Sequence, residues 1–264
     1  MDPIAKMKEA ARVAWASFTP FEMLTGSVAP DLVRFASVKH GQRVLDVGCG
    51  TGVVALTAAR VGATVTGADL TPALLEAGRA NATLAGLDVE FIEADVEALP
   101  FDDARFDVVL SQFGHMFGPR PEVTIAEMLR VLKPGGTIAF STWPPELYTG
   151  RMFALTGRYA PPLPDGARSP IEWGDPHIVR ERLADAVSEL RFDRGCMRFP
   201  ALSPAHARIF MERNAAPVLK IVESLGAEPD RLAAFRAEFD ALAGQYFHDN
   251  FVRQDFLMSR ALKR

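Results

Sequence analysis

The chain alternates between short apolar runs and longer segments with the 3.6-residue period of amphipathic helices. In the first run, Val44, Leu45 and Val47 are β-branched or aliphatic, and a helix pattern follows over residues 53–60. Further apolar runs of this kind occupy residues 63–68, 89–92, 106–111 and 137–142. Short apolar runs separated by helical segments predict a buried, mainly parallel sheet with helices packed against it.

Other elements are predicted before and after this alternating core. Amphipathic helices are expected over residues 4–18 and 28–39, and two more over 203–225 and 230–247. Seven prolines fall between residues 144 and 176, which predicts an irregular segment such as a lid, or alternatively a flexible surface excursion. A helix over 177–186 and strands over 187–199 and 251–259 complete the prediction.

A glycine turn follows the first predicted strand and suggests a nucleotide site. Gly48, Gly50 and Gly52 alternate with other residues, and glycine lets the backbone approach a ligand closely. However, Val53 stands where the dinucleotide fingerprint needs its third glycine. Asp46 ends the strand and would be poorly placed against a pyrophosphate but well placed for a cationic ligand. The pattern therefore disfavours an NAD-dependent oxidoreductase.

A second carboxylate, Asp69, ends the next predicted strand. It lies 23 residues after Asp46, close to the spacing at which an acidic residue binds a ribose diol in nucleotide-binding folds. A carboxylate can accept hydrogen bonds from both hydroxyls of such a diol. The alternative is that Asp69 caps the helix that begins near Thr71 and Pro72.

Composition narrows the class of protein. The 264 residues are 48% hydrophobic and 23% charged, which is ordinary for a globular chain, and no metal site is predicted. The formal net charge of −4 argues against a broad nucleic-acid surface. The two cysteines suit a reducing, cytoplasmic setting, and neither a signal peptide nor a membrane span is expected from the sequence.

The segment Leu45–Gly52 resembles motif I of class I S-adenosylmethionine-dependent methyltransferases. The resemblance continues to residue 143 and includes the run 127–137, which is typical of the superfamily. It implies a doubly wound, Rossmann-like α/β fold with a seven-stranded sheet in the order 3-2-1-4-5-7-6, strand 7 antiparallel, and helical cap insertions. The expected single domain, 1–264, comprises cover helices (1–41), a cofactor-binding core (42–143), cap or lid insertions (144–176 and 203–247) and the last strand (250–262).

The resemblance also implies a cofactor, S-adenosylmethionine, and the residues that bind it. Asp95 would accept a hydrogen bond from the adenine amino group, and Val96 would present its amide to the ring. Glu93 and Glu97 are expected in an acidic surface loop. The predicted cofactor-binding residues are Asp46, Gly48, Cys49, Gly50, Thr51, Gly52, Asp69, Leu70, Asp95, Val96, Ser111, Gln112 and Phe113.

The implied activity is methyl transfer to a small-molecule acceptor. The branch with ubiquinone and menaquinone methyltransferases is the most similar, so a quinone ring is one option. A non-catalytic S-adenosylmethionine-binding or regulatory module is the alternative. His115 is the candidate catalytic base, with a packed histidine as the alternative. The candidate substrate-pocket residues are Trp15, Phe18, Phe21, His115, Trp143 and Trp173, although aromatic residues also dominate ordinary cores.

Overall fold

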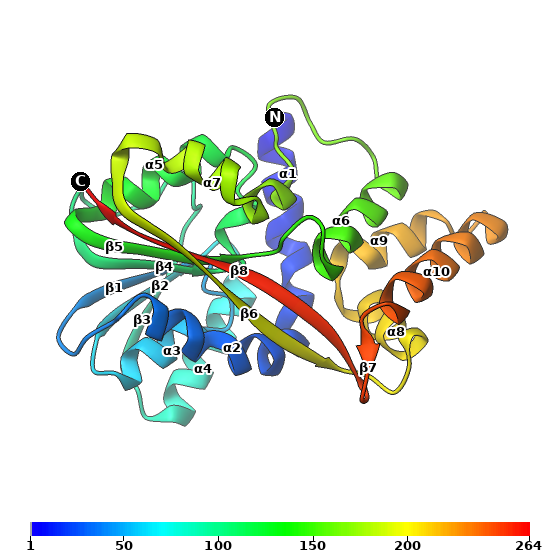
Figure 1. Ribbon diagram of the computed structural model, residues 1–264, viewed down its shortest axis with the longest axis horizontal. Coiled ribbons are helices and arrows are strands. Elements are labelled where there is room, and N and C mark those ends of the chain that lie inside the picture. Colours follow the sequence, from blue (N-terminus) through cyan, green and yellow to red (C-terminus); the bar gives the residue numbers. More distant parts are fainter. Residues whose placement is uncertain (1) are drawn as a thin grey trace.

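A mixed β-sheet forms the centre of the computed structural model, which describes residues 2–264 (Figure 1). Its strands follow the order β3-β2-β1-β4-β5-β8-β6, and a short strand, β7, pairs with β8 beside this path. The expected order 3-2-1-4-5-7-6 is confirmed. The short strand β7 precedes the last long strand, which is therefore numbered 8 and not 7. The strands are β1 (Arg43–Val47), β2 (Thr64–Asp69), β3 (Val89–Glu93), β4 (Phe106–Gln112), β5 (Leu132–Thr142), β6 (Val187–Pro200), β7 (Phe247–His248) and β8 (Phe251–Lys263).

The register of the sheet brings the candidate site to one edge. Val44 of β1 pairs with Val65 of β2 and Val108 of β4, and all three strands run parallel. The last long strand, β8, runs antiparallel to both β5 and β6, as expected for the strand placed over 250–262. Parallel strands end on the same side, so the loops after β1, β2 and β4 meet there, where ligands bind in open α/β sheets.

Helices cover both faces of the sheet (Figure 1). One buried cluster joins α2 and α3 to one face, and another joins α5, η3 and α7 to the opposite face. A smaller cluster packs Leu75 of α4 against Phe91 of β3. These elements are α2 (Glu22–Phe35), α3 (Val53–Arg60), α4 (Pro72–Ala85), α5 (Pro121–Val131), η3 (Pro170–Gly174) and α7 (Pro176–Leu183), and η4 (Ala184–Ala186) leads into β6.

A second hydrophobic core lies beyond the sheet. Strands β6 and β8 extend past the other strands, and four helices gather around this extension at the right of Figure 1. Phe199 of β6 and Val252 of β8 are buried there with Phe235 and Phe239. We call this part the cap; its helices are α6 (Tyr148–Tyr159), α8 (Pro204–Asn214), α9 (Ala216–Ser224) and α10 (Pro229–Gly244).

Two expectations about the cap are wrong. Residues 148–159 form the regular helix α6, because the prolines of this stretch stand before and after the helix and do not interrupt it. Residues 203–247 form three helices, since Ala215 is extended and a new helix begins at Ala216 with Pro217 in its first turn. The cap is therefore a packed helical layer, and the proline-rich stretch stays irregular, as expected, chiefly over residues 144–147 and 160–169.

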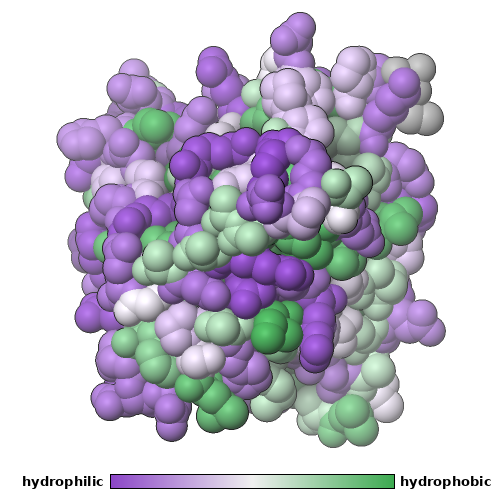
Figure 2. All heavy atoms as spheres, turned by 90° about the vertical axis from the view of Figure 1, so that its right-hand side faces the viewer, coloured by the Kyte–Doolittle hydropathy of each residue, from purple (hydrophilic) through white to green (hydrophobic). Residues whose placement is uncertain are grey.

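The N-terminal residues lie against the rest of the chain without contributing much to its core. Helix α1 (Pro3–Ala14) has no buried residue, whereas the following turn, η1 (Trp15–Phe21), buries Phe21. Seen from the cap end, the surface mixes hydrophilic residues with smaller hydrophobic groups (Figure 2). Over residues 2–264, no helix combines the length and the apolar character that a membrane span requires.

Candidate functional site

A cavity of about 240 Å³ lies between the carboxyl edge of the sheet and the cap. A smaller cavity of about 40 Å³ adjoins it at the glycine turn, and the two share Phe18, Thr25, Gly48, Gly50 and Gln112. The large cavity is lined by eight predicted cofactor residues: Gly48, Gly50, Asp69, Leu70, Asp95, Val96, Gln112 and Phe113. The small one is lined also by Asp46, Cys49 and Thr51, whereas Gly52 and Ser111 line neither cavity.

Two loops cross at the floor of the site with no room for a side chain. A Cβ atom on Gly48 would come within 2.7 Å of the Gly114 Cα, and one on Gly114 within 2.4 Å of the Gly48 carbonyl oxygen. Gly48 also has a positive φ of 64°, which other residues rarely adopt. Ser111 supports this crossing, because its hydroxyl donates to the Val47 carbonyl (2.6 Å) and accepts from the His115 amide (2.9 Å).

The Asp69 side chain links the loop that follows β1 to the loop that follows β2. Its Oδ2 accepts from the Gly50 amide at 2.8 Å and its Oδ1 from the Thr71 amide at 2.9 Å. Helix α4 begins at Pro72, so the bonded amide precedes the helix and Asp69 does not cap it. Burial raises the pKa of the Asp69 carboxyl, and the side chain still lines the large cavity. The carboxylate is thus fixed in place where a ligand can reach it.

Asp46 presents an unpaired carboxylate oxygen at the small cavity. Its Oδ2 accepts from the Ala55 amide in the first turn of α3 (3.0 Å), while Oδ1 has no hydrogen-bond partner among residues 2–264. The residue is only 1% exposed. Burial, together with the charge of Asp69, raises the pKa of Asp46 to about 8. A cationic group bound here would supply the missing partner and favour the ionised carboxylate.

An ion-pair cluster lies at the wall of the large cavity, and Glu97 is its buried member. Lys8 of α1 contacts Asp95 (2.6 Å) and Glu97 (2.5 Å), and Arg120 contacts Glu97 at 2.7 Å. The expectation that Glu97 is a surface residue is wrong: its side chain is fully buried by these two cations. Glu93, in contrast, is exposed and pairs with Arg12. The cluster fastens α1 across the cavity beside Asp95.

Four of the six candidate substrate residues line the large cavity. Trp15, Phe18 and Phe21 approach it from η1, where the rings of Phe18 and Phe21 stack at 4.5 Å. The Trp15 ring lies 4.6 Å from that of Phe117, in the turn η2 (His115–Phe117). Trp143 also lines the cavity and stacks on Phe113 at 4.0 Å. These aromatic residues belong to both the pocket wall and the adjoining core.

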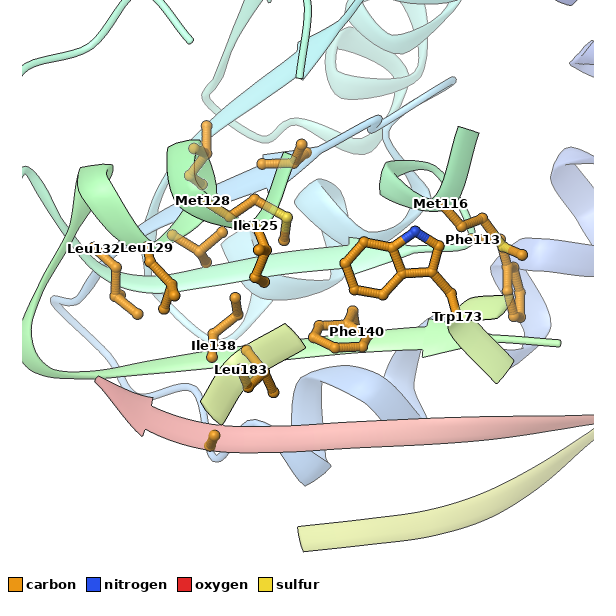
Figure 3. Packing of buried hydrophobic residues seen from close by; sticks show 14 of the residues in the cluster. Phe113, Met116, Ile125, Met128, Leu129, Leu132, Ile138, Phe140, Trp173 and Leu183 are labelled. Atoms are coloured by element: carbon orange, nitrogen blue, oxygen red, sulfur yellow. The ribbon is translucent and has the colours of Figure 1, made fainter. Parts of the chain in front are cut away.

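His115 and Trp173 lie in the core, so the expectation that they line the pocket is corrected. Their rings are 4.7 Å apart and both pack on Phe140; Figure 3 shows Trp173 beside Phe140 and Met116. His115 is fully buried, and neither ring nitrogen has a partner in the described chain. Burial lowers its pKa to about 3, which keeps the imidazole neutral. The structure thus favours the packed histidine over a catalytic base.

Several residues of the cavity wall were absent from the sequence prediction. Lys8 comes from α1, Thr149 and Thr156 from α6, and Gln254 from β8. Their helical or strand periodicity signals only an amphipathic element. Only the packing of these helices and of β8 around the cavity shows which face of each element lines it.

Comparison with known proteins agrees with this geometry. Residues 45–140 match the family model described as "Methyltransferase domain". An uncharacterized protein of Mycobacterium tuberculosis is 36% identical, covering 92% of this chain and 89% of its own. A demethylmenaquinone methyltransferase of Clavibacter sepedonicus is 47% identical over 39% of this chain and 43% of that protein. A putative methyltransferase structure from Bacillus halodurans has a TM-score of 0.61 at 21% identity, covering 90% and 99% of the two chains.

The fold, the glycine turn and these matches define one class of protein. The chain belongs to the class I S-adenosylmethionine-dependent methyltransferases. S-Adenosylmethionine is accordingly its cofactor, and the residues present fit that molecule. Asp46 offers an unpaired acceptor for an ammonium group, and the crossing at Gly48 leaves backbone exposed to the cavity.

Proposed function

We propose that the protein transfers a methyl group from S-adenosylmethionine to a small-molecule acceptor held between the sheet and the cap. One observation carries this proposal: a single cavity is lined both by the donor-side residue Asp69 and by cap residues such as Thr149 and Met211. A module that only bound the donor would not need a cavity that extends from the donor side to the cap. We further propose that residues 1–264 act as one domain, with 144–176 and 203–247 selecting the acceptor.

The donor side would be bound by the three predicted carboxylates. Asp46 would accept from the α-ammonium group of the methionine part, and Asp69 from the ribose hydroxyls. Asp95 would accept from the adenine amino group while it stays paired with Lys8, and the Val96 amide would face the ring. These assignments are supported by the lining of the cavities: Asp69 and Asp95 line the large one, and Asp46 lines the small one that adjoins it.

The protein's contribution to the reaction would be positioning and exclusion of water. Bound S-adenosylmethionine would supply a methyl group activated by its sulfonium and would be left as the neutral thioether S-adenosylhomocysteine. The chain must hold the acceptor in line behind that methyl, and positioning alone contributes several kcal/mol to such reactions, on the order of 7 or more in favourable cases. The aromatic wall formed by Trp15, Phe18 and Phe117 would keep water from the reacting atoms.

The comparison with relatives does not identify the methyl acceptor. The demethylmenaquinone methyltransferase covers less than half of this chain, so its quinone substrate remains one option for the present protein. Donor carrying an isotopically labelled methyl group, incubated with the protein and a metabolite extract, would label the acceptor for identification by mass. Transfer into one small molecule is the expected result.

The alternative, a binding or regulatory module, predicts a different outcome of the same experiment. Such a module would bind S-adenosylmethionine in calorimetry yet label nothing in the extract. The Asp69→Asn variant provides the matched control, since it alters the donor side and leaves the cap untouched. Equal labelling by Asp69→Asn at a donor concentration below saturation would contradict the placement of the donor at Asp69.

A further inference from the structure

The cap side of the large cavity is lined almost entirely by apolar side chains. We call this part the acceptor chamber; its apolar wall consists mainly of Met152, Phe153, Met197, Met211, Ala215 and Val218. Three polar side chains interrupt this wall: Thr149, Thr156 and Gln254. The titratable residues around the whole cavity are Lys8, Asp69 and Asp95, and all three lie on the donor side. Within residues 2–264, therefore, no charged group faces the chamber.

Four residues of helix α6, two of them threonines, line the chamber in one stripe. Thr149, Met152, Phe153 and Thr156 follow the spacing of a single helix face, so the two threonines lie about 10 Å apart along the helix axis. The Thr156 hydroxyl donates to the Phe153 carbonyl at 3.0 Å, which leaves its oxygen free only to accept. The Thr149 hydroxyl has no partner in the described chain although the residue is only 6% exposed.

Gln254 adds an amide from the strand that packs against α6. It pairs with Met197 across β8 and β6, and both side chains line the chamber. Gln254 is 8% exposed, and its side-chain amide can donate as well as accept. A buried hydroxyl without a partner is unfavourable, and the Gln254 amide on the wall of the same cavity offers complementary bonds to an oxygen-bearing ligand.

We propose that the acceptor is a ring-sized apolar molecule that carries an uncharged hydroxyl or carbonyl oxygen, which Thr149 and Gln254 bind. This inference rests on the proposed function and concerns the recognition of the acceptor. A carboxylate, phosphate or ammonium group would lose its hydration in the chamber and find no opposite charge there. The chamber therefore selects against charged acceptors as well as for a neutral oxygen group.

Four probes that share one ring system test this selection. We would measure binding of 1-naphthol, naphthalene, 1-naphthoate and (1-naphthyl)methylammonium by calorimetry, in the presence of saturating S-adenosylhomocysteine. The expected order places 1-naphthol first, naphthalene about five- to tenfold weaker, and both ions at least tenfold weaker than 1-naphthol. A charged probe that binds as tightly as 1-naphthol, or the failure of all four to bind, would overturn the proposal.

Variants of Thr149 and Gln254 test whether these side chains cause the preference for 1-naphthol over naphthalene. Thr149→Val keeps the shape of the side chain and should reduce the preference for 1-naphthol over naphthalene to less than twofold, whereas Thr149→Ser should retain it. Gln254→Leu should act like Thr149→Val, and Thr83→Val, on the exposed face of α4, should change nothing. An unchanged preference in Thr149→Val contradicts the assignment. Calorimetry with S-adenosylhomocysteine alone separates the proposed function from the proposed choice of acceptor. If S-adenosylhomocysteine fails to bind, the proposed donor site is wrong, whatever the chamber selects.

Discussion

Replacing Asp46 with Asn should stabilise the free protein at neutral pH and weaken its affinity for the donor. The Asp46 side chain is buried, and Asn can still accept from the Ala55 amide as Oδ2 does now. What the substitution removes is the ionisable oxygen at the small cavity, where Oδ1 has no partner. The carboxylate thus costs stability in the free protein and becomes useful only when a cation binds beside it.

The size of the effect follows from the pKa of Asp46, which burial raises from 3.8 to about 8. The folded protein therefore holds a proton that the unfolded chain releases, so this carboxyl favours folding below pH 4 and loses that contribution as the pH rises toward 8. Each pH unit in this window corresponds to about 1.4 kcal/mol. Between pH 5 and pH 8 we expect Asp46→Asn to gain about 2–4 kcal/mol of stability relative to the wild type.

Urea unfolding at several pH values measures this difference directly, with the two proteins compared in the absence of donor. Asp88→Asn is the matched control, because it removes the same charge from an exposed position. Calorimetry should also show donor binding to Asp46→Asn weakened by roughly 1.5–3 kcal/mol, as for a lost charge-assisted hydrogen bond. Parallel stability curves for the wild type and Asp46→Asn across this pH range would refute the reasoning.

Three further predictions concern the other residues of the site. Asp69→Asn should weaken donor binding by roughly 1.5–3 kcal/mol in calorimetry, since it disturbs a carboxylate that also holds Gly50 and Thr71; unchanged affinity with a lowered melting temperature would assign Asp69 a structural role only. Lys8→Met should lower the free energy of unfolding by about 1–3 kcal/mol because it leaves Glu97 with Arg120 alone; Lys6→Met, on the exposed surface of α1, is the control. His115→Phe should leave the pH profile of methyl transfer unchanged, because the pKa of His115 is lowered to about 3 and the ring does not line the cavity; a lost basic or acidic limb would restore it as a catalytic candidate.

The parts of the fold that were predictable from sequence are those encoded locally. The strand before the glycine turn, the turn itself and the carboxylate after the next strand are each visible within a few residues. Their apolar runs and glycine spacing therefore predicted β1, β2 and the edge where Asp46 and Asp69 lie. The strand order came from the family resemblance, and the register of β5, β8 and β6 confirms it.

The parts that escaped prediction depend on contacts between distant segments. Glu97 is buried because Lys8, 89 residues earlier in the chain, packs against it and forms an ion pair with its carboxylate. His115 points into the core because Trp173 packs on its ring. The helix α6 was missed because a count of prolines does not show that they stand outside it.

Transfer of a labelled methyl group, compared between a chamber variant and a surface control, tests the central claim most directly. Ala215 lines the chamber, so Ala215→Trp would place a large ring where the acceptor should bind; Ala160→Trp adds the same ring at an exposed position outside the cavity. The account predicts that both variants bind S-adenosylhomocysteine like the wild type, and that only Ala215→Trp fails to label the acceptor in the extract. Undiminished labelling by Ala215→Trp would contradict the placement of the acceptor between the sheet and the cap.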